Sequence, residues 1–211
     1  MYRLFVKRLL DIIISLLALP FVGLAILVMA PLIYLEDKGP VFYNAPRRGK
    51  DGKEFKMFKL RSMYVNSPDL KNADGSTFNS ENDARVTKVG RFLRKTSVDE
   101  LPQILNVLIG DMSFIGPRPT LITMPYDQLP EISKRRLGAR PGITGYAQAY
   151  YRNSIGQQEK FQYDCIYVEN VSFLLDVKIV FKTLTTVLLR KNIYVSTEGK
   201  PIEMAKSTDI Q

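Results

Sequence analysis

The sequence contains no histidine, and Cys165 is the only cysteine among its 211 residues. Without histidine, Ser-His-Asp and Cys-His nucleophilic systems and histidine metal sites are excluded. A single cysteine likewise excludes a disulfide scaffold and a zinc-thiolate cluster. A nucleophile or metal ligand must therefore come from carboxylates, hydroxyls or lysine, and a hard, oxygen-preferring ion such as Mg²⁺ is the metal that this composition suits.

Acidic residues are scarce relative to basic ones. The chain has 21 of the first kind and 30 of the second, which gives a formal net charge of +9. Such a surplus favours an anionic partner, which could be nucleic acid, acidic lipid headgroups or a phosphorylated substrate. Charge alone does not choose among the three.

Charge is absent from Ile12 to Leu35, a stretch long enough to span a bilayer as a helix. Its length, and the lack of a small-residue cleavage site after it, argue against a secretory signal peptide. Pro20 lies near the middle of the stretch, where it removes a backbone hydrogen bond and predicts a bend.

Basic residues flank this apolar stretch on both sides, and the positive-inside tendency would place both ends in the cytoplasm. A re-entrant helix that bends at Pro20 and returns to the same side satisfies both observations. A straight span that tolerates its proline is the alternative. The basic flanking residues are Arg3, Lys7 and Arg8 before the stretch and Lys38, Arg47, Arg48 and Lys50 after it.

The remainder of the sequence predicts a small, helix-rich α+β domain. Short strands are expected near residues 41–63, where Val41–Tyr43 and Phe55–Phe58 flank a turn at Arg48–Gly52. The polar residues 66–83 predict a surface loop or a lid. Amphipathic helices at the membrane interface are expected over 126–136 and 157–169. The charged apolar stretch 171–189 predicts another helix, either interfacial or packed in the core.

An amphipathic helix with one buried stripe is predicted just after residue 100 and is ended by Gly110. Ser97 and Glu100 have the spacing of a capping box, whereas Pro102 favours an N-cap at Val98 or Asp99. The stripe consists of Leu101, Ile104, Leu105, Leu108 and Ile109.

The carboxylate pair Asp99–Glu100 falls at the start of this helix, downstream of Arg91, Arg94 and Lys95. Acidic residues are common at such positions because they complement the helix dipole. The functional interpretation is that dipole and arginines keep Asp99 ionised and gather phosphate oxygens around it. In a chain without histidine, an ionised carboxylate among cations is a candidate nucleophile for phosphorus.

Several basic side chains are candidates for binding phosphate. Arg118 lies between two prolines in Gly116–Pro119, and a restrained guanidinium suits a phosphate, although an exposed proline-rich turn is the simpler interpretation. Arg140 begins the segment 140–145, whose glycines permit close backbone approach to a ligand. Lys59 and Arg61 are further candidates, although strand alternation explains them equally well.

These elements together resemble the bacterial sugar transferases, the small monotopic phosphoglycosyl transferases that begin glycoconjugate assembly on a polyprenol carrier. The resemblance covers about residues 1–194. It rests on Lys7–Asp11, Phe58–Met63, Thr96–Gln103, Gly116–Pro119 and Arg140–Gly145, which occur in the family's order and spacing.

This resemblance implies a re-entrant helix in the bacterial inner membrane, with catalysis at its cytoplasmic face. Asp99 would attack the β-phosphorus of a UDP-sugar and release UMP, and a polyprenol phosphate, expected to be undecaprenyl phosphate, would collect the phosphosugar. Glu100 would assist, Mg²⁺ held by Asp99 and Glu100 would neutralise the diphosphate, and Arg118 would hold phosphate oxygens. The substrate-binding set is expected to be Lys59, Arg61, Arg94, Arg118 and Arg140.

The expected organisation is a re-entrant membrane helix over 1–38, a catalytic domain over 39–194 and a polar tail over 195–211. One departure from the family concerns the bend, where members often carry serine before the proline. Leu19 stands here instead, and Ser15 is the nearest hydroxyl that could replace it.

Two other classes of function compete with the transferase. A non-catalytic membrane-anchored protein that binds nucleotide sugars or a partner glycosyltransferase explains the charge and the apolar helix, but not the acidic pair among arginines. A nucleic-acid binder explains the charge alone, so no nucleic acid is expected as a partner. The sequence leaves self-association open and does not name the sugar.

Overall fold

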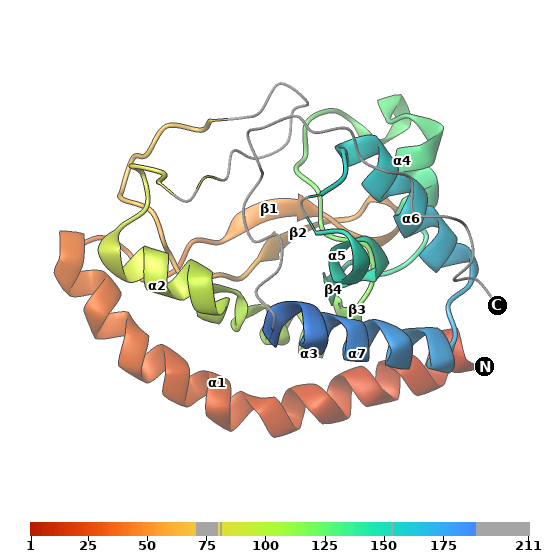
Figure 1. Ribbon diagram of the computed structural model, residues 1–211, viewed down its shortest axis with the longest axis horizontal. Coiled ribbons are helices and arrows are strands. Elements are labelled where there is room, and N and C mark those ends of the chain that lie inside the picture. Colours follow the sequence, from red (N-terminus) through yellow and green to blue (C-terminus); the bar gives the residue numbers. More distant parts are fainter. Residues whose placement is uncertain (71–79, 81, 153, 189–211) are drawn as a thin grey trace.

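Figure 1 shows the computed structural model, in which one long, bowed helix underlies all the other elements. The structure describes residues 1–70, 80, 82–152 and 154–188. Most of the loop expected over 66–83 and all of the tail expected over 195–211 lie outside the described residues.

The long helix is α1, Lys7–Asp37, which continues a short π-helical segment, Tyr2–Val6. Within the described part of the chain it is the one helix that is long and apolar enough to cross a membrane, and only 11% of its most apolar window is buried. Pro20 and Pro31 lie inside α1 without ending it. The bend expected from Pro20 is therefore present as a bow, and both ends of α1 turn toward the rest of the molecule (Figure 1).

A β-hairpin follows α1, within the region where strands were expected. Strands β1 (Ala45–Arg48) and β2 (Glu54–Met57) pair antiparallel around a 3-10 turn, Lys50–Gly52. The first strand lies later than predicted, since Phe42 forms only an isolated bridge to Leu60. The reason is the turn, where the positive φ angles of Asp51 and Gly52 reverse the chain directly after residue 48.

Helices α2 (Lys88–Thr96) and α3 (Gln103–Ile109) are separated by a 3-10 turn, Val98–Glu100. The predicted capping box is wrong, because Ser97 adopts a left-handed conformation that ends α2 and its side chain caps no helix. The N-caps proposed at Val98 and Asp99 are also wrong, since Pro102 is the N-cap of α3. The acidic pair thus lies in a separate turn between two helices.

The buried face of α3 differs from the predicted stripe. Its buried residues are Gln103, Ile104, Asn106 and Val107, whereas Leu105 and Ile109 are exposed. The stripe was misleading because α3 packs against α1, an apolar helix that is itself exposed. Beside such a helix, apolar side chains do not by themselves mark the interior.

A second, parallel sheet was not predicted. Strands β3 (Ser113–Ile115) and β4 (Gly142–Thr144) are each three residues long, too short for a periodic pattern. The glycines here bring backbone against backbone: a Cβ on Gly142 would lie 2.1 Å from the nitrogen of Gly116, and one on Gly145 would lie 2.1 Å from its oxygen. The close approach expected of these glycines is thus to another chain segment.

The remaining helices are a 3-10 turn (Tyr126–Gln128), α4 (Glu131–Arg136), α5 (Tyr146–Tyr150), α6 (Gln157–Glu169) and α7 (Phe173–Leu188). The bounds of α6 are those predicted. Of the segments expected at an interface, only α7 lies beside α1, while α4 and α6 lie on the opposite side of the molecule (Figure 1). Packing in the core is shown for α7, because Ile179 is fully buried, and Phe181 on the same helix is exposed. Contact of α7 with a membrane interface stays a prediction.

Candidate active site

The acidic pair converges on a single ammonium group. Asp99 is buried, with a side chain only 3% exposed, and Glu100 is 20% exposed. The Nζ atom of Lys59 lies 2.8 Å from Asp99 Oδ2 and 3.4 Å from Glu100 Oε1. The structure therefore brings together Lys59, Asp99 and Glu100, three residues that the sequence suggested as site residues.

Arg118 completes this arrangement by binding the same oxygen of Glu100 that Lys59 approaches. Its guanidinium donates to Glu100 Oε1 at 3.1 Å, yet its side chain stays 55% exposed. The carbonyl oxygen of Arg118 accepts a hydrogen bond from Arg136 at 2.8 Å, and Arg136 is held by a buried ion pair with Asp164. We call Asp99, Glu100, Lys59 and Arg118 the dyad cluster.

The cluster keeps Glu100 ionised. Burial opposes ionisation of this carboxyl, but the charges of Arg118 and Lys59 outweigh it and lower the pKa of Glu100 to about 2. The charge of Glu100 in turn raises the pKa of Arg118 above its ordinary value. The site therefore presents fixed charges of both signs at neutral pH.

Lys59 is positioned by a side chain that the sequence did not reveal. Asn106, fully buried on α3, accepts a hydrogen bond from the Phe58 nitrogen and donates one to the Lys56 oxygen, each at 2.8 Å. The Leu60 backbone nitrogen donates to the backbone carbonyl oxygen of Asp99 at 2.9 Å. The only available signal was a polar residue within an apolar helix.

Arg47 is a second residue that was missed as a candidate. Burial lowers the pKa of its guanidinium, and the like charge of Arg118 lowers it further. The only hydrogen bond recorded for this guanidinium within the described chain goes to the adjacent Pro46 oxygen, at 2.9 Å. Arg47 therefore adds positive charge close to Arg118.

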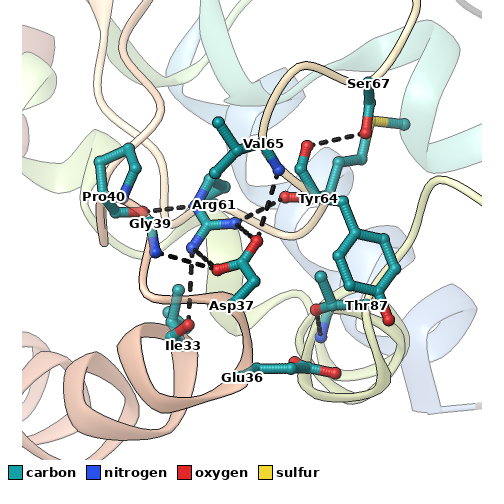
Figure 2. A network of polar contacts seen from close by, with 12 residues as sticks. Ile33, Glu36, Asp37, Gly39, Pro40, Arg61, Tyr64, Val65, Ser67 and Thr87 are labelled. Atoms are coloured by element: carbon teal, nitrogen blue, oxygen red, sulfur yellow. Dashed lines mark hydrogen bonds and ion pairs between the residues drawn. The ribbon is translucent and has the colours of Figure 1, made fainter.

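Arg61 does not join the dyad cluster, although it was expected to bind substrate. Figure 2 shows its guanidinium gripping both carboxylate oxygens of Asp37, at 2.6 Å each. It also donates to the oxygens of Pro40 and Met63, at 2.5 and 3.0 Å. Arg61 thus fastens the end of α1 to the segment that carries Lys59.

Arg94 and Arg140 also lie outside the cluster. Arg94 donates to the Ser62 hydroxyl at 3.0 Å, and Arg140 donates to the Gly110 oxygen at 2.8 Å. Arg8 binds the Val107 and Leu108 oxygens at the same end of α3. Arg140 and Arg8 therefore satisfy carbonyl groups at the end of α3 opposite to the dyad.

The carboxylates of Asp99 and Glu100 fit a magnesium ion, because they already meet around one positive charge and offer oxygen ligands. No group of three or more acidic, histidine or cysteine side chains able to hold a metal occurs among the described residues. Waters or substrate oxygens would have to supply the other ligands.

Fold and site together define a small α+β domain packed on one long apolar helix, with a charged carboxylate dyad. The chain belongs to the bacterial sugar transferase family, whose model matches residues 2–190. This confirms the resemblance drawn from its motifs.

Similar proteins come from several bacteria. The chain is 42% identical to the UDP-N-acetylgalactosamine-undecaprenyl-phosphate N-acetylgalactosaminephosphotransferase of Aeromonas hydrophila, across 87% of this chain and 44% of that protein. It is 42% identical to the UDP-glucose:undecaprenyl-phosphate glucose-1-phosphate transferase of Klebsiella pneumoniae, across 89% and 41%. The uncharacterized sugar transferase EpsL of Bacillus subtilis is also 42% identical, across 89% of each chain. The chain thus spans less than half of the first two relatives.

Proposed function

We propose that this protein transfers a sugar 1-phosphate from a UDP-sugar to a polyprenol phosphate, with undecaprenyl phosphate as the expected carrier. The observation that carries the proposal is the dyad cluster, in which a buried Asp99 lies beside Lys59 and a half-exposed Arg118. Phosphoryl transfer depends mainly on positioning and charge neutralisation, which such a cluster supplies. The names of the Aeromonas and Klebsiella relatives agree with this chemistry.

The proposed reaction has two steps. A carboxylate oxygen of Asp99 attacks the β-phosphorus of the donor, the bond from that phosphorus to the bridging oxygen breaks, and UMP leaves with that oxygen. The acceptor's phosphate oxygen then attacks the phosphosugar on Asp99, which frees the carboxylate and forms the lipid diphosphate sugar. Each step forms one phosphorus–oxygen bond and breaks one.

The other members of the cluster stabilise the charge that moves during these steps. Lys59 holds Asp99 Oδ2 from 2.8 Å, and it can share its positive charge with the donor diphosphate. Arg118 is half exposed and can bind phosphate oxygens as a fork. A magnesium ion held by Asp99 and Glu100 would add Lewis-acid neutralisation of the diphosphate.

We further propose that α1 is re-entrant and that the cluster lies at the cytoplasmic face of the inner membrane. Both ends of α1 are tied to the same domain, through Lys7–Asp176 and Asp37–Arg61, each at 2.6 Å. A helix that crossed the bilayer would separate its ends by the full membrane thickness. In a chain whose Cys165 is replaced by serine, Leu4→Cys and Leu35→Cys should therefore each react with a reagent confined to the cytoplasmic side.

An intact-mass experiment tests the transfer itself. Purified protein in detergent is incubated with Mg²⁺ and a panel of UDP-sugars without lipid acceptor, and any adduct is mapped by peptide. We expect a sugar-phosphate addition on the peptide that contains Asp99, lost in Asp99→Asn, together with release of UMP. UMP release only when polyprenol phosphate is present would overturn the covalent step. Silence under both conditions would favour the binding-protein alternative.

A further inference from the structure

We propose that Arg61 is a positioning residue that makes the placement of Lys59 depend on the end of the membrane helix α1. The proposal rests on the proposed function only in assigning Lys59 to the reaction. Its structural part concerns an ion pair and a backbone ladder, and it can be tested without any substrate.

The first link joins Arg61 to α1. The ion pair with Asp37 is largely buried, with side chains 7% and 14% exposed. Gly39, directly after the helix, lies against this pair: its nitrogen donates to Asp37 at 3.1 Å, and a Cβ there would lie 2.9 Å from the guanidinium. Figure 2 shows α1, the following loop and the Arg61 segment meeting at this point. The end of α1 is therefore fixed to Arg61 by a bidentate ion pair.

The second link joins Arg61 to Lys59 through the backbone. The Arg61 nitrogen donates to the Val41 oxygen, and the Tyr43 nitrogen donates to the Lys59 oxygen, each at 2.8 Å. Phe42 and Leu60 form the bridge between these hydrogen bonds. The loop that leaves α1 is thus paired with residues 59–61, and the Asp37–Arg61 contact anchors this ladder.

The third link joins the ladder to the dyad. The Leu60 backbone nitrogen donates to the backbone carbonyl oxygen of Asp99 at 2.9 Å. The backbone around Lys59 therefore lies between the loop after α1 and the turn Val98–Glu100 that carries the dyad. A lysine side chain has a flexible four-carbon stem, and its ammonium is placed only as well as its backbone is. A misplacement of about 1 Å can cost on the order of 10²-fold in rate.

The other end of α1 supplies a matched control. Asp176 on α7 is 4% exposed, and its carboxylate accepts from Lys7 at 2.6 Å, Tyr2 at 2.5 Å and Tyr167 at 2.8 Å. It is thus another buried carboxylate that holds the same helix through a cation. Its partners belong to the segment 2–7 and to α6, not to the ladder.

Lysine footprinting tests the proposal directly. Wild-type protein, Asp37→Asn, Arg61→Lys and Asp176→Asn are labelled briefly with acetic anhydride in the same detergent. Labelling of Lys59 is measured by peptide mass spectrometry relative to the exposed Lys53, and thermal unfolding is recorded for each variant. Arg61→Lys keeps the charge and loses the fork, so it remains informative if Asp37→Asn does not fold.

We expect several-fold more labelling of Lys59 in Asp37→Asn and Arg61→Lys, because the ammonium is no longer held against two carboxylates. Turnover should fall about 10²-fold in kcat in these variants, with a smaller change in KM for the donor. Asp176→Asn should lower thermal stability and leave Lys59 labelling at the wild-type level.

Unchanged labelling in folded Arg61→Lys, or an equal rise in Asp176→Asn, would overturn the proposal. Wild-type protein that protects Lys59 but shows no turnover with any donor would contradict the proposed function instead. The two failures are therefore distinguishable.

Discussion

The dyad cluster and the ion pair of Asp37 with Arg61 at the end of α1, here called the α1-end cluster, both join carboxylates to an arginine. They differ in how many hydrogen-bond donors of that arginine find acceptors inside the protein. Arg61 is 7% exposed and is surrounded by Asp37 and backbone oxygens, whereas Arg118 is 55% exposed and makes one ion pair, to Glu100. A guanidinium whose donors all bind acceptors inside the protein holds the surrounding segments together. One that keeps donors at the surface can receive a ligand.

The comparison predicts that Arg61 matters more for stability than Arg118. Arg61→Ala leaves Asp37 partly buried without its cation, and we expect it to lower the free energy of unfolding by about 3–5 kcal/mol. Chemical denaturation in detergent measures this. A decrease in the free energy of unfolding of less than about 1 kcal/mol would mean that the α1-end cluster does not hold the structure together as proposed.

Arg118 should show the reverse pattern. Arg118→Ala should lower kcat/KM for the donor by about 10²–10³-fold, because a group that neutralises the transferring phosphate is removed. Stability should fall by only about 1 kcal/mol, less than for Arg61→Ala, because Arg118 is half exposed but its ion pair with Glu100 is lost. Arg118→Lys should recover only part of the activity, because lysine keeps the charge without the fork. Full activity of Arg118→Ala would contradict its assignment to the substrate.

The depressed pKa of Glu100 gives the dyad cluster a pH signature. Because this pKa is lowered from 4.5 to about 2, ionised Glu100 stabilises the fold above pH 4.5, and this contribution is lost as the pH falls toward 2. The melting temperature of the wild type should exceed that of Glu100→Gln at pH 6. The difference should shrink through this window, and a difference that grows on acidification would contradict the assigned charges.

The smallest effect is expected on the face of α1 that packs against the domain. The hydroxyl of Ser15 is buried without a hydrogen-bond partner among the described residues, whereas the Ser113 hydroxyl donates to Asp11 at 3.1 Å. Ser15→Ala should therefore raise the free energy of unfolding by about 1 kcal/mol, and Ser113→Ala should lower it by a similar amount. An equal decrease in the free energy of unfolding in both variants would show that Ser15 does bind a partner. Ser15 would then take the role of the serine that family members often carry at the position of Leu19, before the proline.

The sequence predicted the centre of the site better than its surroundings. Asp99, Glu100, Lys59 and Arg118 lie together as their motifs suggested, but Arg61 and Arg140, from similar motifs, bind internal oxygens. Motif spacing shows which residue types occur together. It does not show whether a guanidinium finds its acceptors inside the protein.

The fold was predictable where patterns are long. The apolar helix follows from an uncharged run of two dozen residues, 12–35, whereas β3 and β4 have three residues each. The bounds of α6 were also predicted. The buried face of α3 was misjudged because exposed apolar side chains, such as Leu105 and Ile109, follow the same periodicity as core residues. Asn106, which holds the Lys59 segment, has no recognisable motif of its own.

Because α1 is fastened to the domain along its length, we expect that residues 39–188 do not form a separable soluble fragment. A chain that starts after residue 38 would lack Ile33, which packs with Leu60 and Leu93, and Asp11, which accepts from Ser113 and the Phe114 nitrogen. It would also lose Arg8, which binds carbonyl oxygens at the end of α3, and Lys7, which pairs with Asp176. Expression trials that trim the apolar helix to gain solubility should therefore yield aggregated protein, and detergent or nanodiscs around the full chain are the productive route.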